Sequence, residues 1–227
     1  MWSGKIEDYI LYEDKNIIVC HKPAGLAVQN ARIGSADMES ALKNYLYKKE
    51  PGKMPYLGIV HRLDQPVEGI LVFAHTPFAA KELSRQILGG QMEKIYLAVT
   101  KEKPEKEEGI LEDYLKKDGR TNMSAVVAEG TPGAKKARLS YQVIHEETER
   151  FLIKIKLDTG RHHQIRVQMA HAGMPLTGDR KYGGTTDTAL GLCACSLTFL
   201  YPGSRKKMHF KVKPKGLSVN SKFRHPQ

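Results

Sequence analysis

Residues 61–74 read HRLDQPVEGILVFA, a polar segment that leads directly into an apolar one. The apolar part, Gly69 to Ala74, is short and follows turn-forming residues, as is typical of a buried strand. Leu57 to Val60, just before the quoted residues, predicts another short strand. The segment HRLDQPVE must then be a loop between two strands, so several ionisable side chains stand at a strand–loop junction.

The rest of the chain predicts many strands and few helices. Further strands are expected at Asn16 to Cys20, Lys94 to Thr100, Leu192 to Leu200 and Met208 to Val212, at Leu139 to His145 and Phe151 to Leu157 as a hairpin pair, and after the turn in HKPAGLAV (21–28). Helices are expected at Ala36 to Lys48, from Thr76-Pro77 to Leu88 before Gly89-Gly90, and at Arg161 to Ala172 with Ile165, Met169 and Ala172 on one side. Because strands and helices do not alternate regularly, this pattern indicates an α+β fold on a largely antiparallel sheet.

The chain is basic overall, and its carboxyl end contributes most of the net positive charge. Its 227 residues suffice for one large domain, which we expect to cover 1–227. The 36 Lys and Arg against 25 Asp and Glu give a net charge of +11, which favours nucleic acid as a partner over a merely solvated basic surface. Residues 201–227 contain no acidic residue, so this basic stretch is either a phosphate-contacting arm or a solvated tail.

The ends and the cysteines indicate the compartment. The amino-terminal residues MWSGKIEDYI lack the apolar core of a signal peptide, and stretches such as Ile70 to Ala74 are far too short to span a membrane. Three cysteines suit a reducing compartment, so we expect a cytoplasmic protein with no membrane contact. Cys193 and Cys195 share one face of a predicted strand and are interpreted as small buried residues rather than a redox or metal pair, and Cys20 as a core residue.

Two side chains on or beside the predicted strands are candidates for chemistry. Asp64, flanked by Arg62, is well placed to reach a ligand, although a turn aspartate that bonds its own backbone before Pro66 has the same pattern. Tyr96 lies on the opposite face of its strand from Ile95, Leu97 and Val99. If those aliphatic residues fill the core, Tyr96 faces a surface or groove beside Lys94, where its ring could stack on a base. An ordinary cross-strand packing tyrosine is the alternative.

The segment Thr159 to Arg166, TGRHHQIR, concentrates hydrogen-bond donors at a predicted strand-to-helix junction. Backbone N–H groups at such a junction can bind anions, and Arg161 and Arg166 could neutralise phosphate or pair with a carboxylate. The neighbouring histidines do not have the spacing of metal ligands. Polar residues that cap the helix are the alternative interpretation.

Five segments in this order resemble the RluA-type family of RNA pseudouridine synthases. They are HKPAGLAV (21–28), HRLDQPVEGILVFA (61–74), KIYLAV (94–99), TGRHHQIRVQMAHAGMPLTGDRKYG (159–183) and LCACSLTF (192–199), and the likeness extends over about residues 10 to 213. The resemblance implies a mixed, mostly antiparallel sheet with flanking helices and a central RNA-binding cleft. It also implies conversion of selected uridines in ribosomal or transfer RNA to pseudouridine, with no metal or organic cofactor. We expect the protein to be a monomer.

By motif position, the resemblance implies that Asp64 is the catalytic aspartate, Tyr96 the active-site tyrosine and Arg166 the arginine that pairs with the aspartate. It places Arg62 beside the nucleotide, and RNA contacts are further expected from His61, Lys94, Arg161, His163 and Gln164. The target atoms are inaccessible in a base stack, so the uridine must be flipped out against Tyr96. Asp64 would attack the anomeric carbon or remove a proton from the neighbouring ribose carbon.

The sequence departs from the family pattern at three places. Val67-Glu68 replaces the usual Thr-Ser pair before Gly69. The extra carboxylate of Glu68 could make Asp64 harder to ionise or simply face solvent. Cys193 stands where histidine is common, and we expect the chain to begin almost directly with the catalytic core, without a small amino-terminal RNA-binding domain. Two other functions stay open: a catalytically silent RNA-binding protein or RNA chaperone, which would not need Asp64, and a thiol-dependent enzyme built on Cys193 and Cys195.

Overall fold

The computed structural model describes residues 4–30, 35–184, 188–215 and 217, and within them the chain divides into two compact units. The first unit comprises the described residues up to Lys94 together with Ala194–Pro214, and the second comprises Ile95–Cys193 and the described residues from Lys215 onward. The boundary falls inside two strands, β5 (Glu93–Thr100) and β10 (Leu192–Leu200), so no loop in the sequence marks it.

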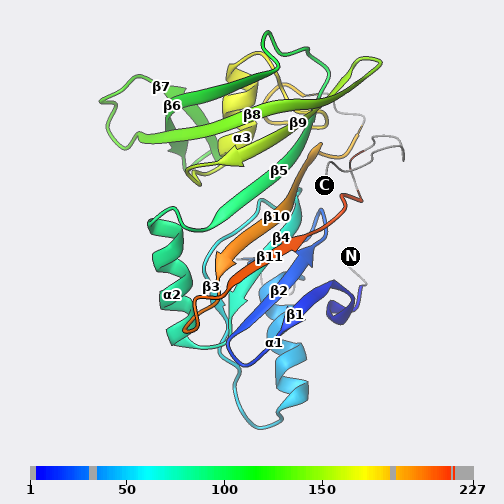
Figure 1. Ribbon diagram of the computed structural model, residues 1–227, viewed down its shortest axis with the longest axis vertical. Coiled ribbons are helices and arrows are strands. Elements are labelled where there is room, and N and C mark those ends of the chain that lie inside the picture. The colour runs from blue at the N-terminus through cyan, green and yellow to red at the C-terminus, as the bar shows by residue number, and fades with distance from the viewer. Residues whose placement is uncertain (1–3, 31–34, 185–187, 216, 218–227) are drawn as a thin grey trace. The chain divides into compact units, whose positions relative to one another are not determined.

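The first unit contains a sheet in which β1, β2, β4 and β10 follow one another (Figure 1). β2 (Ile17–Lys22) pairs antiparallel with β4 (Glu68–Ala74), and short strands complete the sheet: β1 (Ile10–Glu13) beside β2, β3 (Gly58–Ile59) beside β4 and β11 (Lys207–Lys211) beside β10. The strands expected around 16–20, 69–74, 192–200 and 208–212 are confirmed. The strand expected after the turn in HKPAGLAV is wrong, because only an isolated bridge between Ala27 and Asp37 forms there.

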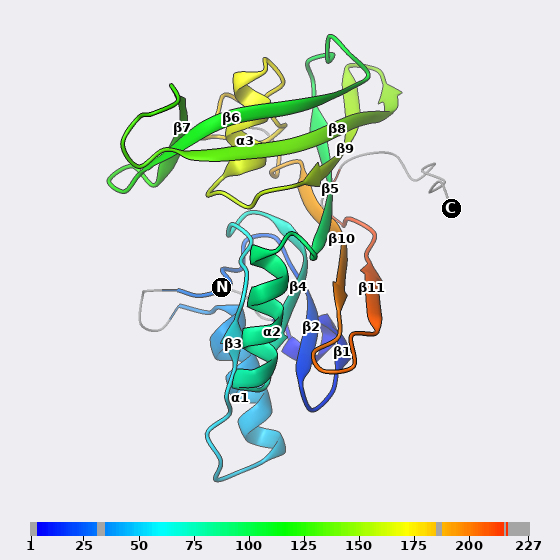
Figure 2. The same ribbon diagram turned by 60° about the vertical axis from the view of Figure 1, so that its left-hand side comes forward.

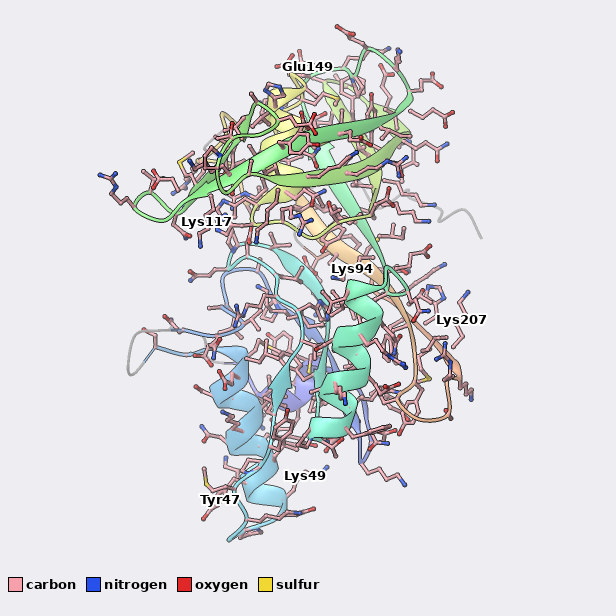
Figure 3. All side chains as sticks on the ribbon, turned by 90° about the vertical axis from the view of Figure 1, so that its left-hand side faces the viewer. Tyr47, Lys49, Lys94, Lys117, Glu149 and Lys207 are labelled. Atoms are coloured by element: carbon pink, nitrogen blue, oxygen red, sulfur yellow. The ribbon has the colours of Figure 1, made fainter. Side chains whose placement is uncertain are left out.

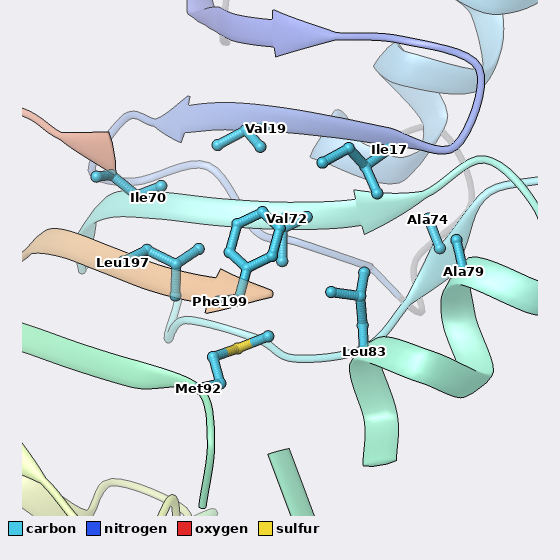
Figure 4. Close-up of a cluster of buried hydrophobic side chains, with 10 residues drawn as sticks. All are labelled: Ile17, Val19, Ile70, Val72, Ala74, Ala79, Leu83, Met92, Leu197 and Phe199. Carbon is cyan, nitrogen blue, oxygen red and sulfur yellow. The ribbon is translucent and has the colours of Figure 1, made fainter. Parts of the chain in front are cut away.

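The core of the first unit lies between this sheet and helix α2 (Pro77–Leu88), as Figure 4 shows. Leu83 of α2 and Phe199 of β10 are completely buried in it. The expected helix boundaries are confirmed, because the Thr76 hydroxyl accepts a hydrogen bond from the Ala79 N–H and Gly89 caps the other end. The remaining helices of the unit are α1 (Met38–Lys49), capped by Asp37, and the short 3-10 helix Ile6–Tyr9.

The second unit is built on five antiparallel strands in the order β5–β9–β8–β6–β7. β8 (Lys135–Glu147) and β9 (Arg150–Leu157) form the expected hairpin with longer strands. β6 (Glu108–Asp118) and β7 (Met123–Val127) were not predicted, and helix α3 (Gln164–His171) packs against both of them (Figure 2). Both units thus combine a mostly antiparallel sheet with helices, and the predicted α+β class is confirmed.

In the second unit, Ile95 and Leu97 do not fill the core, which was the condition for placing Tyr96 at a surface, and the single buried side expected for the helix at Arg161 to Ala172 is wrong. On β5, Tyr96 is only 7% exposed whereas Ile95 and Leu97 are half-buried, so the tyrosine lies on the more buried face of the strand. Helix α3 begins at Gln164 rather than Arg161, because His163 takes a left-handed conformation with φ 53° just before it. Every residue of 164–169 is buried and Ala172 is exposed, so α3 has no single buried side for periodicity to reveal.

Candidate active site

The loop that carries Asp64 is tied to the loop that follows β2. A turn closes when the Val67 N–H donates to the Asp64 carbonyl at 3.0 Å. The Gly25 N–H donates to the Gln65 carbonyl at 2.9 Å, and the Gln65 side-chain amide donates back to the Gly25 carbonyl at 3.0 Å. Asp64 itself is half-buried, so its carboxylate stands on a loop whose backbone is held at several points.

Lys22 lies beneath this connection and is completely buried at the end of β2. Its ammonium group donates to three backbone carbonyls, those of Pro23 at 3.0 Å, Leu26 at 2.7 Å and Gln65 at 3.0 Å. Burial lowers the pKa of Lys22 to about 7, against the charges of Asp64 and Glu68, which raise it. One lysine therefore joins the loop after β2 to the Asp64 loop, a role that the sequence analysis did not predict.

Glu68 does not face solvent, contrary to one of the two possibilities raised by the sequence. It is 5% exposed at the start of β4, and its carboxylate lies 2.8 Å from Nε2 of His21, which is also buried. His21 and Glu68 are near one another because β2 and β4 pair antiparallel with Lys22 opposite Gly69. The carboxylate of Glu68, four residues after Asp64, is thus paired with the His21 side chain.

His61 and Arg62 lie at the start of the same loop and have different surroundings. His61 Nε2 accepts a hydrogen bond from the Val72 backbone N–H at 3.1 Å. Burial, reinforced by the charge of Lys94, holds the pKa of His61 well below its ordinary value, which agrees with a neutral acceptor nitrogen. Arg62 is exposed, and its guanidinium donates to the side chain of Gln29 at 3.0 Å. Lys94 is half-buried, and burial lowers its pKa.

The half-buried His61, whose pKa is lowered, predicts a loss of stability in mild acid. Its pKa is lowered in the folded protein, so below about pH 6.5 the unfolded chain binds a proton that the folded chain does not. Folding stability should therefore fall with decreasing pH, by up to about 1.4 kcal/mol per pH unit for this one group. We expect denaturant unfolding between pH 8 and 5 to show a steeper decline for the wild type than for His61→Gln.

Measurements at pH 8, where a histidine is neutral in both states, give the pH-independent cost of this substitution and serve as the control. If the difference in unfolding free energy between the two proteins were the same at pH 8 and pH 5, His61 would not be the source of the acid sensitivity.

In the second unit, Arg166 forms a buried ion pair with Asp179. The guanidinium donates from Nε to Oδ2 and from Nη2 to Oδ1, both at 2.8 Å, and the two residues are 5% and 1% exposed. Its carbon Cζ lies 5.2 Å from the centre of the Tyr182 ring. Asp179 and Tyr182 belong to GDRKYG (178–183), the end of the motif at 159–183, but no role for either residue was predicted from the sequence.

The remaining residues of TGRHHQIR are largely engaged within the second unit. Gln164 is 3% exposed, accepts from the Thr159 hydroxyl and the Arg161 N–H, and donates to the Arg138 carbonyl. His163 is buried and bonds to the Tyr182 hydroxyl at 2.8 Å. Arg161 is exposed, and its Nε donates to the Lys136 carbonyl at 2.8 Å. RNA contacts of these three residues stay predictions.

The described residues contain neither a disulfide bond nor a cluster of metal-binding side chains. Cys20 and Cys193 are buried as expected and Cys195 is half-buried, and none of the three forms a disulfide bond. Among the described residues, no three His, Cys, Asp or Glu side chains gather closely enough to bind a metal ion. The helices of this part of the chain are also too short or too polar for any of them to cross a lipid bilayer.

Comparison with known proteins identifies the family. Residues 16–171 match the family described as RNA pseudouridylate synthase. The chain belongs to this family. The stretch includes the Asp64 loop, Tyr96 and Arg166, so the resemblance noted from the five motifs is confirmed.

Several curated relatives of the family are similar over most of the chain. A ribosomal large subunit pseudouridine synthase D of Nitrosomonas europaea is 39% identical over 181 residues, which are 78% of this chain and 50% of the relative. A protein of the same description from Xylella fastidiosa is 33% identical over 205 residues, 89% of this chain and 60% of the relative. An uncharacterized RNA pseudouridine synthase of Zymomonas mobilis is 34% identical over 179 residues, which are 78% of this chain and 80% of the relative. The chain thus spans about half of the first relative.

Solved structures show the same fold. The human RNA Pseudouridylate Synthase Domain Containing 4 protein superposes with a TM-score of 0.77 at 23% identity, covering 92% of this chain and 90% of the human one. The human Domain Containing 1 protein gives a TM-score of 0.73 at 21% identity. The mostly antiparallel architecture is therefore that of the family.

Proposed function

We propose that this protein isomerises uridine to pseudouridine in RNA, with Asp64 as the catalytic carboxylate. Membership of the RNA pseudouridylate synthase family supports the reaction, and it is the observation on which the proposal mainly rests. Asp64, Tyr96 and Arg166 occupy the motif positions that the family resemblance assigns to the catalytic aspartate, the tyrosine against the base and the arginine partner of the aspartate. The names of two similar relatives favour ribosomal RNA of the large subunit as the substrate.

In the proposed reaction, the bond between ribose carbon 1′ and uracil nitrogen 1 breaks, and a new bond joins carbon 1′ to uracil carbon 5. Carbon 5 loses a proton and nitrogen 1 gains one, so substrate and product are isomers. Asp64 either attacks carbon 1′ or removes the proton from carbon 2′ to give a glycal intermediate. Both routes need a carboxylate on a positioned loop, and the contacts of Lys22 and Gln65 hold that loop in place.

The activity can be tested with the purified chain and ribosomal RNA fragments, without added metal or nucleotide. Pseudouridine formation would be mapped by chemical labelling, and total RNA of cells with and without the protein would show which uridines depend on it. The proposal predicts a discrete set of modified positions that require the protein. Unchanged pseudouridine in both the fragments and the cellular RNA would contradict it.

The basic turn between β10 and β11 is proposed to contact RNA phosphates. Arg205 and Lys206 in this turn and Lys207 at the start of β11, which Figure 3 labels, are all exposed. The expected arm also includes Lys213 and Lys215, which the structure describes, and Lys222 and Arg224, which lie outside the described residues. Each phosphate contact contributes about 0.7 to 0.9 to the slope of log affinity against log salt concentration. Replacing the three residues with serine should weaken RNA binding at moderate salt and flatten that slope by about two.

A matched control removes the same charge from the loop between β5 and β6. Lys101, Lys103 and Lys106 are exposed as well, but acidic residues alternate with them, so serine substitutions there should leave the salt slope unchanged. Modified positions should stay the same in both variants, because phosphate contacts orient a protein without reading bases. Parallel salt plots for the wild type and the 205–207 variant would mean that this turn does not contact RNA.

A further inference from the structure

The guanidinium of Arg166 is held along one edge by Asp179. The two parallel hydrogen bonds of 2.8 Å fix both the position and the plane of the group, which a single contact would not do. Asp179 is itself restrained, because Oδ1 also accepts from the Lys181 N–H at 3.0 Å and its carbonyl accepts from the Gly184 N–H at 2.8 Å. The acceptor side of the pair is therefore as rigid as the backbone around it.

Tyr182 restrains the same guanidinium from its face. The centre of the aromatic ring lies 5.2 Å from Cζ of Arg166, a distance at which the cation is attracted to the ring. The Tyr182 hydroxyl accepts from the Ser124 N–H at 2.8 Å and bonds to Nδ1 of His163 at 2.8 Å. The ring is thus anchored to β7 and to the residue before α3, the helix that carries Arg166.

Stability alone is a weak reason for such an arrangement. Replacing a buried ion pair by apolar residues is often neutral or stabilising, because removing two charges from water costs as much as their attraction returns. Specific orientation is what a bidentate pair supplies well. A guanidinium has five N–H groups, and the pair with Asp179 uses two of them, one on Nε and one on Nη2.

We propose that Asp179 and Tyr182 are positioning residues that orient the guanidinium of Arg166 for its role in uridine isomerisation. This inference rests on the proposed function, in which Arg166 is the partner of the catalytic carboxylate. Asp179 sets the direction of the guanidinium edge, and Tyr182 sets the tilt of its plane. Neither residue needs to contact RNA, so the loss of either should lower turnover much more than RNA affinity.

The test compares two variants with matched controls in the same unit. Asp179→Asn removes the charge of the buried acceptor, whereas Asp158→Asn removes that of a partly exposed aspartate paired with Arg138 on the surface. Tyr182→Leu removes the ring and its hydroxyl, whereas Tyr114→Leu removes a half-buried tyrosine that bonds to Glu129. We expect kcat to fall about 100-fold for Asp179→Asn and about tenfold for Tyr182→Leu, with RNA Kd changed less than about threefold. The control variants should keep wild-type kcat.

A double-mutant comparison separates positioning from general loss of structure. In an Arg166→Lys background the bidentate pair no longer exists, so Asp179→Asn should lower kcat by less than about threefold further. An equal effect in both backgrounds, or wild-type kcat in both single variants, would overturn the proposal. All assays would be run well below the thermal midpoint of each variant, with circular dichroism confirming that it is folded.

A measurement that does not depend on activity distinguishes failure of this inference from failure of the proposed function. Nuclear magnetic resonance can follow exchange of the Arg166 Nε proton with water, which a bidentate buried pair slows. We expect faster exchange in Tyr182→Leu and in Asp179→Asn, even if the protein modifies no uridine in the chosen RNA. Unchanged exchange in Tyr182→Leu would show that the tyrosine does not restrain the guanidinium.

Discussion

Replacing Asp64 with asparagine is expected to lower the rate of uridine isomerisation by about 10³-fold or more, with little change in RNA affinity. The amide keeps the size of the side chain but can act neither as a nucleophile toward carbon 1′ nor as a base toward carbon 2′. The turn that holds residue 64 is closed by backbone atoms, Val67 N–H and Asp64 carbonyl, so the substitution leaves that bond intact.

Release of tritium from carbon 5 of labelled uridine measures the reaction under single-turnover conditions, because that carbon loses its hydrogen in the product. Binding of the same RNA would be measured in parallel and should stay within a few-fold of the wild type. Asp8→Asn, an equal change of charge at an exposed position of the first unit, is the control and should retain full activity. Substantial turnover by Asp64→Asn, shown by mass spectrometry to be free of deamidated protein, would rule out Asp64 as the catalytic group. It would also revive the alternative of an RNA-binding protein that needs no carboxylate there.

The strands of the first unit could be predicted because their residues are apolar on both faces. Ile17 to Cys20 and Gly69 to Ala74 are central strands with every residue buried, and the sequence shows them as continuous apolar runs. Helix α2 was equally clear, since Thr76 and Gly89 are strong start and stop signals. β6 was missed because half of its residues face solvent and are charged, as in LEDYLKKD, where the apolar alternation is interrupted.

The candidate site could be predicted only as far as its motifs. Asp64 stands at a strand–loop junction, and that position is visible in the sequence. Its surroundings are not: Lys22 reaches the Gln65 carbonyl across 43 residues, and Glu68 finds His21 across 47. The sequence contains one signal for the role of Lys22, because this lysine directly continues an apolar strand. A lysine buried at the end of such a strand must find hydrogen-bond acceptors. Asp179 is a similar case, because it is an acidic residue within the glycine-containing segment 178–184, GDRKYGG.

Gly69→Ala is expected to destabilise the protein by about 3–5 kcal/mol, the largest effect on stability that we predict for a single methyl group. Gly69 has φ +146°, a conformation that residues with a side chain rarely adopt. A Cβ atom there would lie 2.5 Å from Cβ of Ala194 and 2.6 Å from its backbone N and O. The alanine therefore adds backbone strain and a clash with β10, the strand next to β4 in the sheet.

Denaturant unfolding followed by far-ultraviolet circular dichroism gives the free energy of unfolding, with Gly119→Ala as the control. Gly119 has open space around the position of a Cβ atom, so that variant should differ from the wild type by less than about 0.5 kcal/mol. The double variant Gly69→Ala with Ala194→Gly should recover only part of the loss. Removing the Ala194 methyl group relieves one of the three close contacts, while its backbone N and O remain 2.6 Å from the new Cβ and the positive φ is unchanged. Full recovery in the double variant would mean that the side chain of Ala194, and not the close approach of two backbones, is what requires glycine at position 69.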